Sequence, residues 1–84
     1  MTTLVLYGTK FCPFCVRAKQ LLNNKNIAFE EIRVDQDAEQ RNIMRERSGR
    51  TSVPQIFYGD HHIGGCDELH ALERDGGLEK LLAS

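Results

Sequence analysis

The sequence predicts an α/β fold with a four-stranded mixed sheet and helices on both of its faces. Short apolar runs alternate with segments of helical spacing, as expected for strands and for the helices that cover a sheet. The order is βαβ followed by ββα, and a helical crossover between two strands implies a parallel pair with a right-handed connection. The chain has 84 residues, enough for one domain and too few for two, so residues 1–84 are interpreted as a single domain.

The first strand is expected at about residues 3–7, where Leu4-Val5-Leu6-Tyr7 forms an apolar run. A helix of about residues 13–25 should follow, because its apolar side chains fall near one face. These side chains are Val16, Ala18, Leu21 and Leu22. The partly alternating segment Phe29–Val34 is interpreted as the second strand.

The second helix is expected over Ala38–Ser48, after a cap at Asp35 or Asp37 and before a terminating Gly49. Most of its side chains are charged, which indicates a solvated outer face. Its expected core contacts are Ala38, Ile43 and Met44.

The third strand is predicted at Pro54–Tyr58, because proline is tolerated as the first residue of a strand. Gly59-Asp60 should turn the chain into a short antiparallel fourth strand at His61–Ile63. The two histidines of this hairpin point to opposite sides, so they are interpreted as exposed turn residues and not as joint metal ligands. The last helix is predicted after Gly64-Gly65, with an interruption at Gly76-Gly77.

Composition and charge exclude several classes of protein. Eleven basic and twelve acidic residues give a net charge of −1, without a basic block interleaved with aromatics, which argues against nucleic acid as a partner. No apolar run approaches membrane-spanning length and the N-terminus does not resemble a signal peptide, so we expect no membrane partner and a cytoplasmic location. Three cysteines cannot pair fully, which argues against a secreted disulfide scaffold.

Two cysteines, Cys12 and Cys15, lie where the first strand leads into the first helix. Pro13 between them suits the first helical position, where an N–H would be unpaired anyway. The free N–H groups and the positive end of the helix dipole favour a thiolate at Cys12, a candidate nucleophile, with Cys15 as the resolving thiol. The alternatives are two buried structural cysteines or half of a zinc site.

Three elements, Cys12-Pro13-Phe14-Cys15, Ser52-Val53-Pro54 and Gly64-Gly65-Cys66-Asp67, together resemble the glutaredoxins, the glutathione-dependent branch of the thioredoxin fold. The similarity covers essentially the whole chain and is strongest to short bacterial dithiol members. It implies a thioredoxin-like fold and an oxidoreductase that reduces protein disulfides and glutathione mixed disulfides through Cys12 and Cys15. It also implies glutathione as reducing co-substrate, disulfide-containing or glutathionylated proteins as partners, a monomeric state and no required metal.

The resemblance also places a glutathione site beside the two thiols. A cis peptide bond before Pro54 would turn the Val53 backbone toward them, where an extended peptide can pair with it. Gly65 would let the ligand approach closely, and the first N–H groups of the last helix, at Cys66 and Asp67, would bind a carboxylate. The expected contacts are Lys10, Phe14, Arg41, Ser52, Val53, Pro54, Gly65, Cys66, Asp67 and Glu68.

Some of these positions depart from the family pattern. Lys10 lies one residue after the place of a family lysine that contacts the glycyl carboxylate, and Arg41 matches a second-helix residue that binds the same group. Glu68 replaces a frequent aspartate near the ammonium group of the ligand. Phe14 replaces a frequent tyrosine and keeps the ring, and Ser52 replaces threonine, which matters little if backbone atoms bind the ligand.

Three alternatives stay open at this level. Electrons could come from thioredoxin reductase instead of glutathione, although the carboxylate site at the last helix argues against it. The chain could instead hold an iron–sulfur cluster or zinc. Pro13 and Cys15 favour catalysis over this alternative. Cys66 is interpreted as a small buried residue at a helix start, with oxidation or dimer formation as its alternative.

Overall fold

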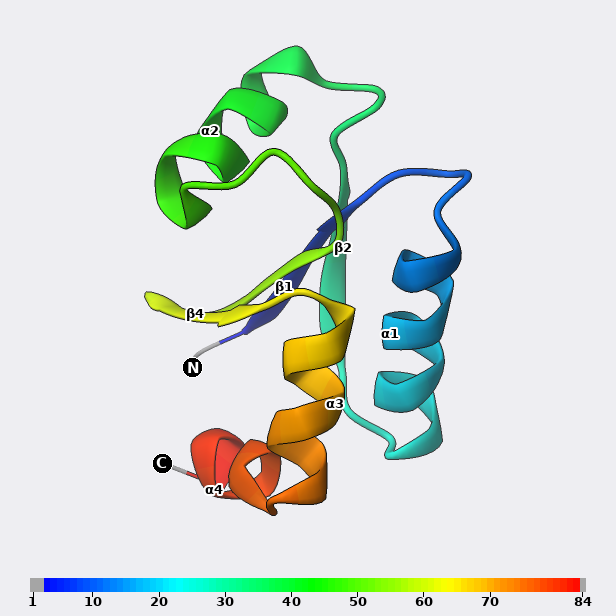
Figure 1. The fold of residues 1–84 in the computed structure, drawn as a ribbon, viewed down its shortest axis with the longest axis vertical. Coiled ribbons are helices and arrows are strands. Elements are labelled where there is room, and N and C mark those ends of the chain that lie inside the picture. The colour runs from blue at the N-terminus through cyan, green and yellow to red at the C-terminus, as the bar shows by residue number, and fades with distance from the viewer. Residues whose placement is uncertain (1–2, 84) are drawn as a thin grey trace.

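The computed structural model describes residues 3–83 and contains a mixed β-sheet with helices on both faces (Figure 1). The elements follow one another as β1 (Leu4–Gly8), α1 (Pro13–Asn24), β2 (Phe29–Arg33), α2 (Ala38–Ser48), β3 (Gln55–Tyr58), β4 (His61–Gly64), α3 (Cys66–Arg74) and α4 (Gly77–Ala83). The expected order, βαβ followed by ββα, is therefore confirmed.

The sheet has the strand order β2-β1-β3-β4, so β1 has a hydrogen-bonded neighbour on each side. β1 runs parallel to β2, with Leu6 opposite Glu31, and antiparallel to β3, with Leu6 opposite Ile56. β4 is antiparallel to β3, as expected for a hairpin. Because successive side chains of a strand point to opposite faces, β1 supplies Leu4 and Leu6 to one face and Tyr7 to the other.

Each face of the sheet has its own apolar core. The larger core lies under α1, α3 and α4, and its buried residues are Leu4, Leu6, Ala18, Leu22, Ile56, Cys66, Leu69 and Leu78. The smaller core lies under α2, on the opposite face, and consists of Tyr7, Val34, Met44 and Phe57. Figure 1 shows α1 and α3 side by side, with α2 set apart from them across the sheet.

Two side chains expected in the core lie at the surface. Val16 on α1 is 44% exposed, and Ala38 is exposed at the start of α2. The reason for the first is the helical period: α1 packs through Cys15, Ala18 and Leu22, which share one face that Val16 does not.

Asp37, and not Asp35, caps α2. Its Oδ1 accepts hydrogen bonds from the N–H groups of Glu39 at 3.1 Å and Gln40 at 3.2 Å. Asp35 instead accepts two hydrogen bonds from the Arg33 guanidinium, at 2.8 and 2.6 Å. The carboxylate that is not needed as a cap thus fixes the loop between β2 and α2.

Two expectations about the β3–β4 hairpin are wrong in detail. Pro54 lies outside β3, which begins at Gln55, because proline has no N–H to donate to a neighbouring strand. His62 is half-buried instead of exposed: its ring stacks on Phe57 with the centroids 4.7 Å apart, and its Nε2 lies 2.7 Å from Gln55 Oε1. His61 is exposed, as expected.

The C-terminal part consists of two short helices. α3 ends at Arg74 and α4 begins at Gly77, so the expected interruption is confirmed, and Gly76 between them has a φ of +76°. None of the helices within residues 3–83 is long and apolar enough to cross a membrane.

Candidate active site

Cys12 occupies the N-cap position of α1, with Pro13 in the first turn, as predicted. Its Sγ accepts a hydrogen bond from the N–H of Cys15 at 3.1 Å and lies 3.8 Å from the carbonyl oxygen of Val53. The Cys12 residue is 8% exposed, so a reacting group must enter a narrow opening to reach it. An anion at a helix N-cap is stabilised by the free N–H groups and the dipole, which suits a thiolate.

The loop before β3 faces this thiol. The peptide bond between Val53 and Pro54 is cis, as the resemblance implied. Ser52 is exposed and Val53 is half-buried, while Pro54 is buried. The cis bond therefore lies in the loop whose Val53 carbonyl oxygen is 3.8 Å from the Cys12 sulfur.

Cys15 is fully buried, one turn further along α1. Burial, followed by a hydrogen bond to Cys12, raises the pKa of the Cys15 thiol to about 12. The backbone of β1 lies against this sulfur, since a Cβ added at Gly8 would lie 3.0 Å from Cys15 Sγ. Cys15 is thus held as a protonated thiol beside Cys12.

This burial predicts a pH profile for alkylation. In a Cys12→Ser variant the largest cause of the raised Cys15 pKa, burial, remains, so we expect iodoacetamide to modify Cys15 only well above the pH at which an ordinary thiol reacts. Mass spectrometry of the quenched reaction, with the denatured variant as control, measures this. Modification of Cys15 in the folded variant at the pH where an exposed thiol reacts would contradict the burial of Cys15.

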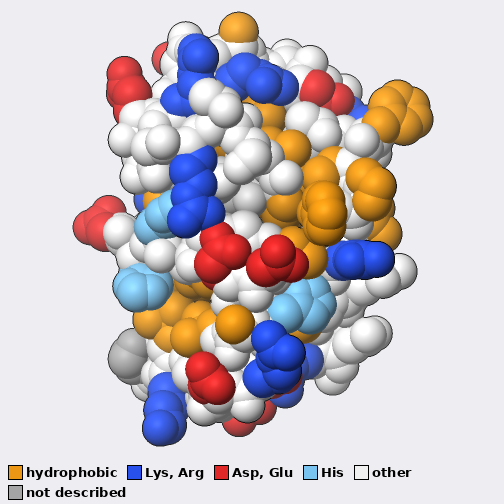
Figure 2. Space-filling model, viewed as in Figure 1, with side chains coloured by type: hydrophobic (Ala, Val, Ile, Leu, Met, Phe, Trp, Pro, Cys, Tyr) orange, Lys and Arg blue, Asp and Glu red, His pale blue; other side chains and the backbone are white. Residues whose placement is uncertain are grey.

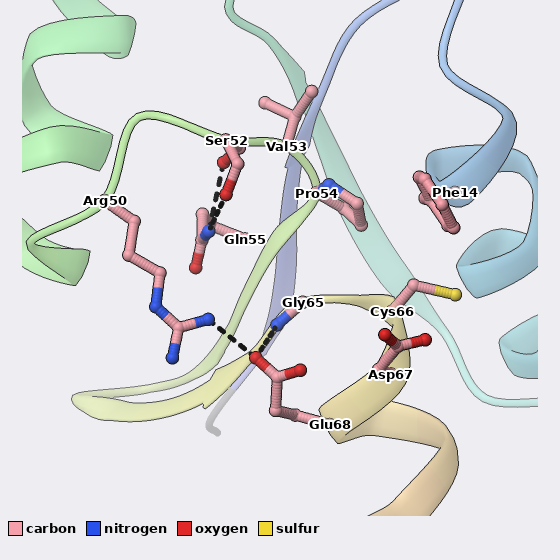
Figure 3. Close-up of a pocket in the computed structure, with 10 residues that line it drawn as sticks. All are labelled: Phe14, Arg50, Ser52, Val53, Pro54, Gln55, Gly65, Cys66, Asp67 and Glu68. Atoms are coloured by element: carbon pink, nitrogen blue, oxygen red, sulfur yellow. Dashed lines mark hydrogen bonds and ion pairs between the residues drawn. The ribbon is translucent and has the colours of Figure 1, made fainter.

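An open pocket of about 210 Å³ lies between the loop before β3 and the start of α3 (Figure 3), and its lining includes Val53, whose carbonyl oxygen is 3.8 Å from the Cys12 sulfur. Its lining residues are Phe14, Arg50, Ser52, Val53, Pro54, Gln55, Gly65, Cys66, Asp67 and Glu68. Three segments far apart in the sequence meet here. The structure thus brings together all the expected ligand contacts except Lys10 and Arg41.

Those two cations do not line the pocket. The Lys10 side chain lies over the Phe11 ring, with Nζ 5.5 Å from its centroid, and the Lys10 backbone N–H donates to Asp35 at 3.3 Å. Arg41 lies on α2, across the sheet from α1 and α3. Position along the sequence could not reveal that Lys10 and Arg41 lie away from the pocket, because the direction of the Lys10 side chain and the position of α2 are set by the fold around them.

The two acidic residues at the start of α3 differ in their surroundings. Glu68 accepts hydrogen bonds from Arg50 at 2.6 Å and from the Gly65 N–H at 3.1 Å, and these contacts hold the pKa of Glu68 below its ordinary value. Asp67 is exposed, and within the described residues nothing forms a hydrogen bond or ion pair with its carboxylate. Glu68 therefore caps the start of α3, while the Asp67 carboxylate is available to a ligand.

Arg50 and Gln55 line the pocket but were not among the residues singled out from the sequence. Gln55 is 1% exposed, and its Nε2 donates to the carbonyl oxygen of Ser52 at 3.0 Å and to the hydroxyl of Ser52 at 3.3 Å. Its Oε1 pairs with His62, so the whole amide is engaged. A polar residue inside an apolar strand was the available signal for Gln55, whereas Arg50 is recognised only by its contact with Glu68.

Cys66 is buried, as expected, and is 6% exposed at the edge of the pocket. Burial raises the pKa of its thiol, and the neighbouring Asp67 adds to the effect. Its Sγ lies 3.4 Å from His70 Nδ1. Within residues 3–83 no third His, Cys, Asp or Glu joins this pair in a group that could hold a metal ion.

Comparison with known proteins agrees with this geometry. The glutaredoxin family model matches residues 4–63. The chain is 50% identical to a glutaredoxin of Pseudomonas aeruginosa over all 84 residues, which is the full length of both proteins. It is also 50% identical to glutaredoxin 3 of Escherichia coli over 82 residues, covering 98% of this chain and 99% of that protein.

Solved structures give the same family. A glutaredoxin from Brucella melitensis superposes with a TM-score of 0.84 at 49% identity, covering 98% of this chain and 89% of that one. A buckwheat glutaredoxin–glutathione complex superposes with a TM-score of 0.88 at 30% identity, covering 98% and 77% of the two chains. The fold is therefore thioredoxin-like.

Proposed function

The chain belongs to the glutaredoxin family of thiol–disulfide oxidoreductases, and on that premise we propose that it reduces glutathione mixed disulfides and protein disulfides with glutathione as co-substrate. The observation that carries the proposal is the Cys12 sulfur, which sits at the N-cap of α1 and accepts the Cys15 N–H at 3.1 Å. The pocket beside it supplies a place for the glutathione.

The first reaction exchanges one disulfide for another. The Cys12 thiolate attacks the glutathione sulfur of a mixed disulfide, so that a new disulfide joins Cys12 to glutathione and the substrate cysteine leaves as a thiolate. The thiolate of a second glutathione then attacks the same glutathione sulfur. This step releases oxidised glutathione and restores the Cys12 thiolate.

A protein disulfide needs the second thiol. After Cys12 has formed a mixed disulfide with the substrate, Cys15 loses its proton and attacks the Cys12 sulfur, which releases the reduced substrate and forms a Cys12–Cys15 disulfide. Two glutathione molecules then reduce this bond and leave as oxidised glutathione. The contacts with Cys12 that help to raise the Cys15 pKa are altered once Cys12 is in a disulfide, which favours the attack at this stage.

The pocket suggests how the tripeptide is held. We infer that the Val53 backbone pairs with the extended peptide and that the free N–H groups of Cys66 and Asp67 bind a carboxylate. The Asp67 carboxylate, which has no partner in the described chain, suits the ammonium of the γ-glutamyl end.

Loss of the Asp67 charge should therefore weaken glutathione binding. For Asp67→Asn we expect the KM for a glutathione mixed disulfide to rise by about three- to tenfold, because the ammonium loses an ionic partner near the protein surface. Steady-state kinetics measure the change. Asp75→Asn, at the other end of α3, is the matched control, and equal KM values for the two variants would contradict this binding mode.

The source of electrons is tested directly. Turnover is compared with glutathione plus glutathione reductase and with thioredoxin reductase alone. We expect turnover with glutathione plus glutathione reductase. Turnover with thioredoxin reductase and no turnover with glutathione would overturn the proposed co-substrate.

We further propose that residues 1–84 form one glutaredoxin domain that works as a monomer in the cytoplasm without a metal. Visible absorption and metal analysis of anaerobically purified protein check the last point. A stoichiometric iron–sulfur cluster or zinc would contradict it.

A further inference from the structure

The exposed large hydrophobic side chains of the described chain lie within five residues of each other around Cys12. They are Phe11, Phe14 and Val16, with exposed fractions of 89%, 52% and 44%, and we refer to them as the Phe11 patch. In Figure 2, hydrophobic side chains (orange) gather at the upper right of the molecule, the side on which Figure 1 shows α1. Apolar side chains clustered on a surface commonly mark a site where a partner docks.

Two cations accompany the patch. Lys10 Nζ lies 5.5 Å from the centroid of the Phe11 ring, and the Arg17 guanidinium carbon lies 5.8 Å from that of Phe14. Four of the eleven Lys and Arg side chains of the chain form salt bridges with carboxylates, and these are Lys19, Lys25, Arg33 and Arg50. Within residues 3–83 the side chains of Lys10 and Arg17 have no such partner.

We propose that the Phe11 patch docks the segment around the target cysteine of a substrate protein, and that it favours segments with apolar and acidic residues. The proposal rests on the function proposed above and adds a substrate class to it. Exposed rings fit apolar side chains, and the unpaired charges of Lys10 and Arg17 fit carboxylates.

The position of Cys12 explains why a substrate segment must lie here. Because Cys12 is 8% exposed, a target sulfur has to enter the opening, and the residues next to it in the substrate then pass over the surrounding side chains. Phe11 directly precedes Cys12, and Phe14 and Val16 follow it in the first turns of α1. A small glutathione mixed disulfide has no such flanking segment and would leave Phe11 uncovered.

The test uses two glutathionylated pentapeptides, Glu-Leu-Cys-Leu-Glu and Lys-Leu-Cys-Leu-Lys, and the mixed disulfide of glutathione with 2-mercaptoethanol. At low salt we expect kcat/KM to be about tenfold higher for the acidic peptide than for the basic one, from two charge contacts of about fivefold or less each. The preference should shrink in about 0.5 M NaCl, where charges are screened within a few ångströms. Equal values for the two peptides at low salt would overturn the proposal.

Two variants assign the effect to the patch. Phe11→Ser should lower kcat/KM for the peptides by about three- to tenfold through lost apolar burial, while the value for the small mixed disulfide stays unchanged. Arg17→Gln should reduce the ratio between acidic and basic peptides, a ratio from which any effect on the nucleophile cancels. Lys80→Gln, on α4, is the control and should leave this ratio as it is.

Docking is also measured without catalysis. The same peptides with serine in place of cysteine are titrated into isotope-labelled protein, and we expect amide shifts at Phe11 and Val16 that saturate at lower concentration with the acidic peptide. If the small mixed disulfide is not turned over, the proposed function fails, and this titration still decides the docking proposal. Binding of anionic phospholipid vesicles that is lost in Phe11→Ser, without peptide-dependent shifts, would assign the patch to a membrane and overturn the proposal.

Discussion

Replacement of Cys12 by serine is expected to abolish both deglutathionylation and the reduction of protein disulfides. The Cys12 sulfur is the one at the N-cap, where the Cys15 N–H and the helix dipole stabilise an anion, and a serine hydroxyl does not ionise at neutral pH. The Cys15 thiol stays buried in this variant, and burial is the largest cause of its raised pKa, so Cys15 cannot take over the attack. Rates with a glutathionylated peptide and with a disulfide-bonded protein, measured with glutathione as reductant, should both fall to the uncatalysed level.

The matched variant Cys15→Ser separates the two activities. We expect it to retain deglutathionylation, because that cycle passes only through Cys12 and glutathione, and to lose the dithiol reduction of proteins. Trapped mixed disulfides between Cys12 and the protein substrate should accumulate and be visible by mass spectrometry. Equal loss of both activities in Cys15→Ser would contradict the division of labour between the two thiols.

Replacement of Gly64 by alanine is expected to destabilise the fold more strongly than replacement of Gly49, the other glycine compared below. Gly64 has a φ of +121°, which residues with a side chain rarely adopt, and an added Cβ would lie 2.8 to 2.9 Å from Oε1, Cβ and Cγ of Glu68. Strain and crowding together should lower the free energy of unfolding by roughly 3–5 kcal/mol. The Cβ of Glu68 is fixed to α3, so the clash is relieved only by moving the helix start that lines the pocket.

Gly49→Ala is the matched control. Gly49 also has a positive φ, +72°, but an added Cβ would meet nothing within 4 Å, so this variant reports the backbone strain without the crowding. We expect it to lose about 1–2 kcal/mol. Urea unfolding of both variants measures the difference, and equal losses would show that contact with Glu68 does not matter. A raised KM for the glutathione mixed disulfide should accompany Gly64→Ala alone.

The strands, the helices and the two thiols could be predicted because their signals are local. Short apolar runs, one partly alternating segment and the turn at Gly59-Asp60 located the strands, and the helical period placed Ala18 and Leu22 in the core. Pro13 marked the helix start, so that Cys12 was expected at the N-cap, where the structure has it. The prediction that Val16 packs in the core is wrong. The buried face of α1 is narrower than the set of apolar residues in the helix, and Val16 lies outside it.

The sequence by itself determined the order of elements, the parallel first crossover and the dithiol at the start of α1. Tertiary structure alone decided which polar side chains meet: Arg50 with Glu68, Gln55 with His62, and Lys10 turned away from the pocket over Phe11. The physical reason is that periodicity and capping depend on residues three or four positions apart. A side chain's partner across the sheet depends on loop directions and packing that no short stretch of sequence encodes.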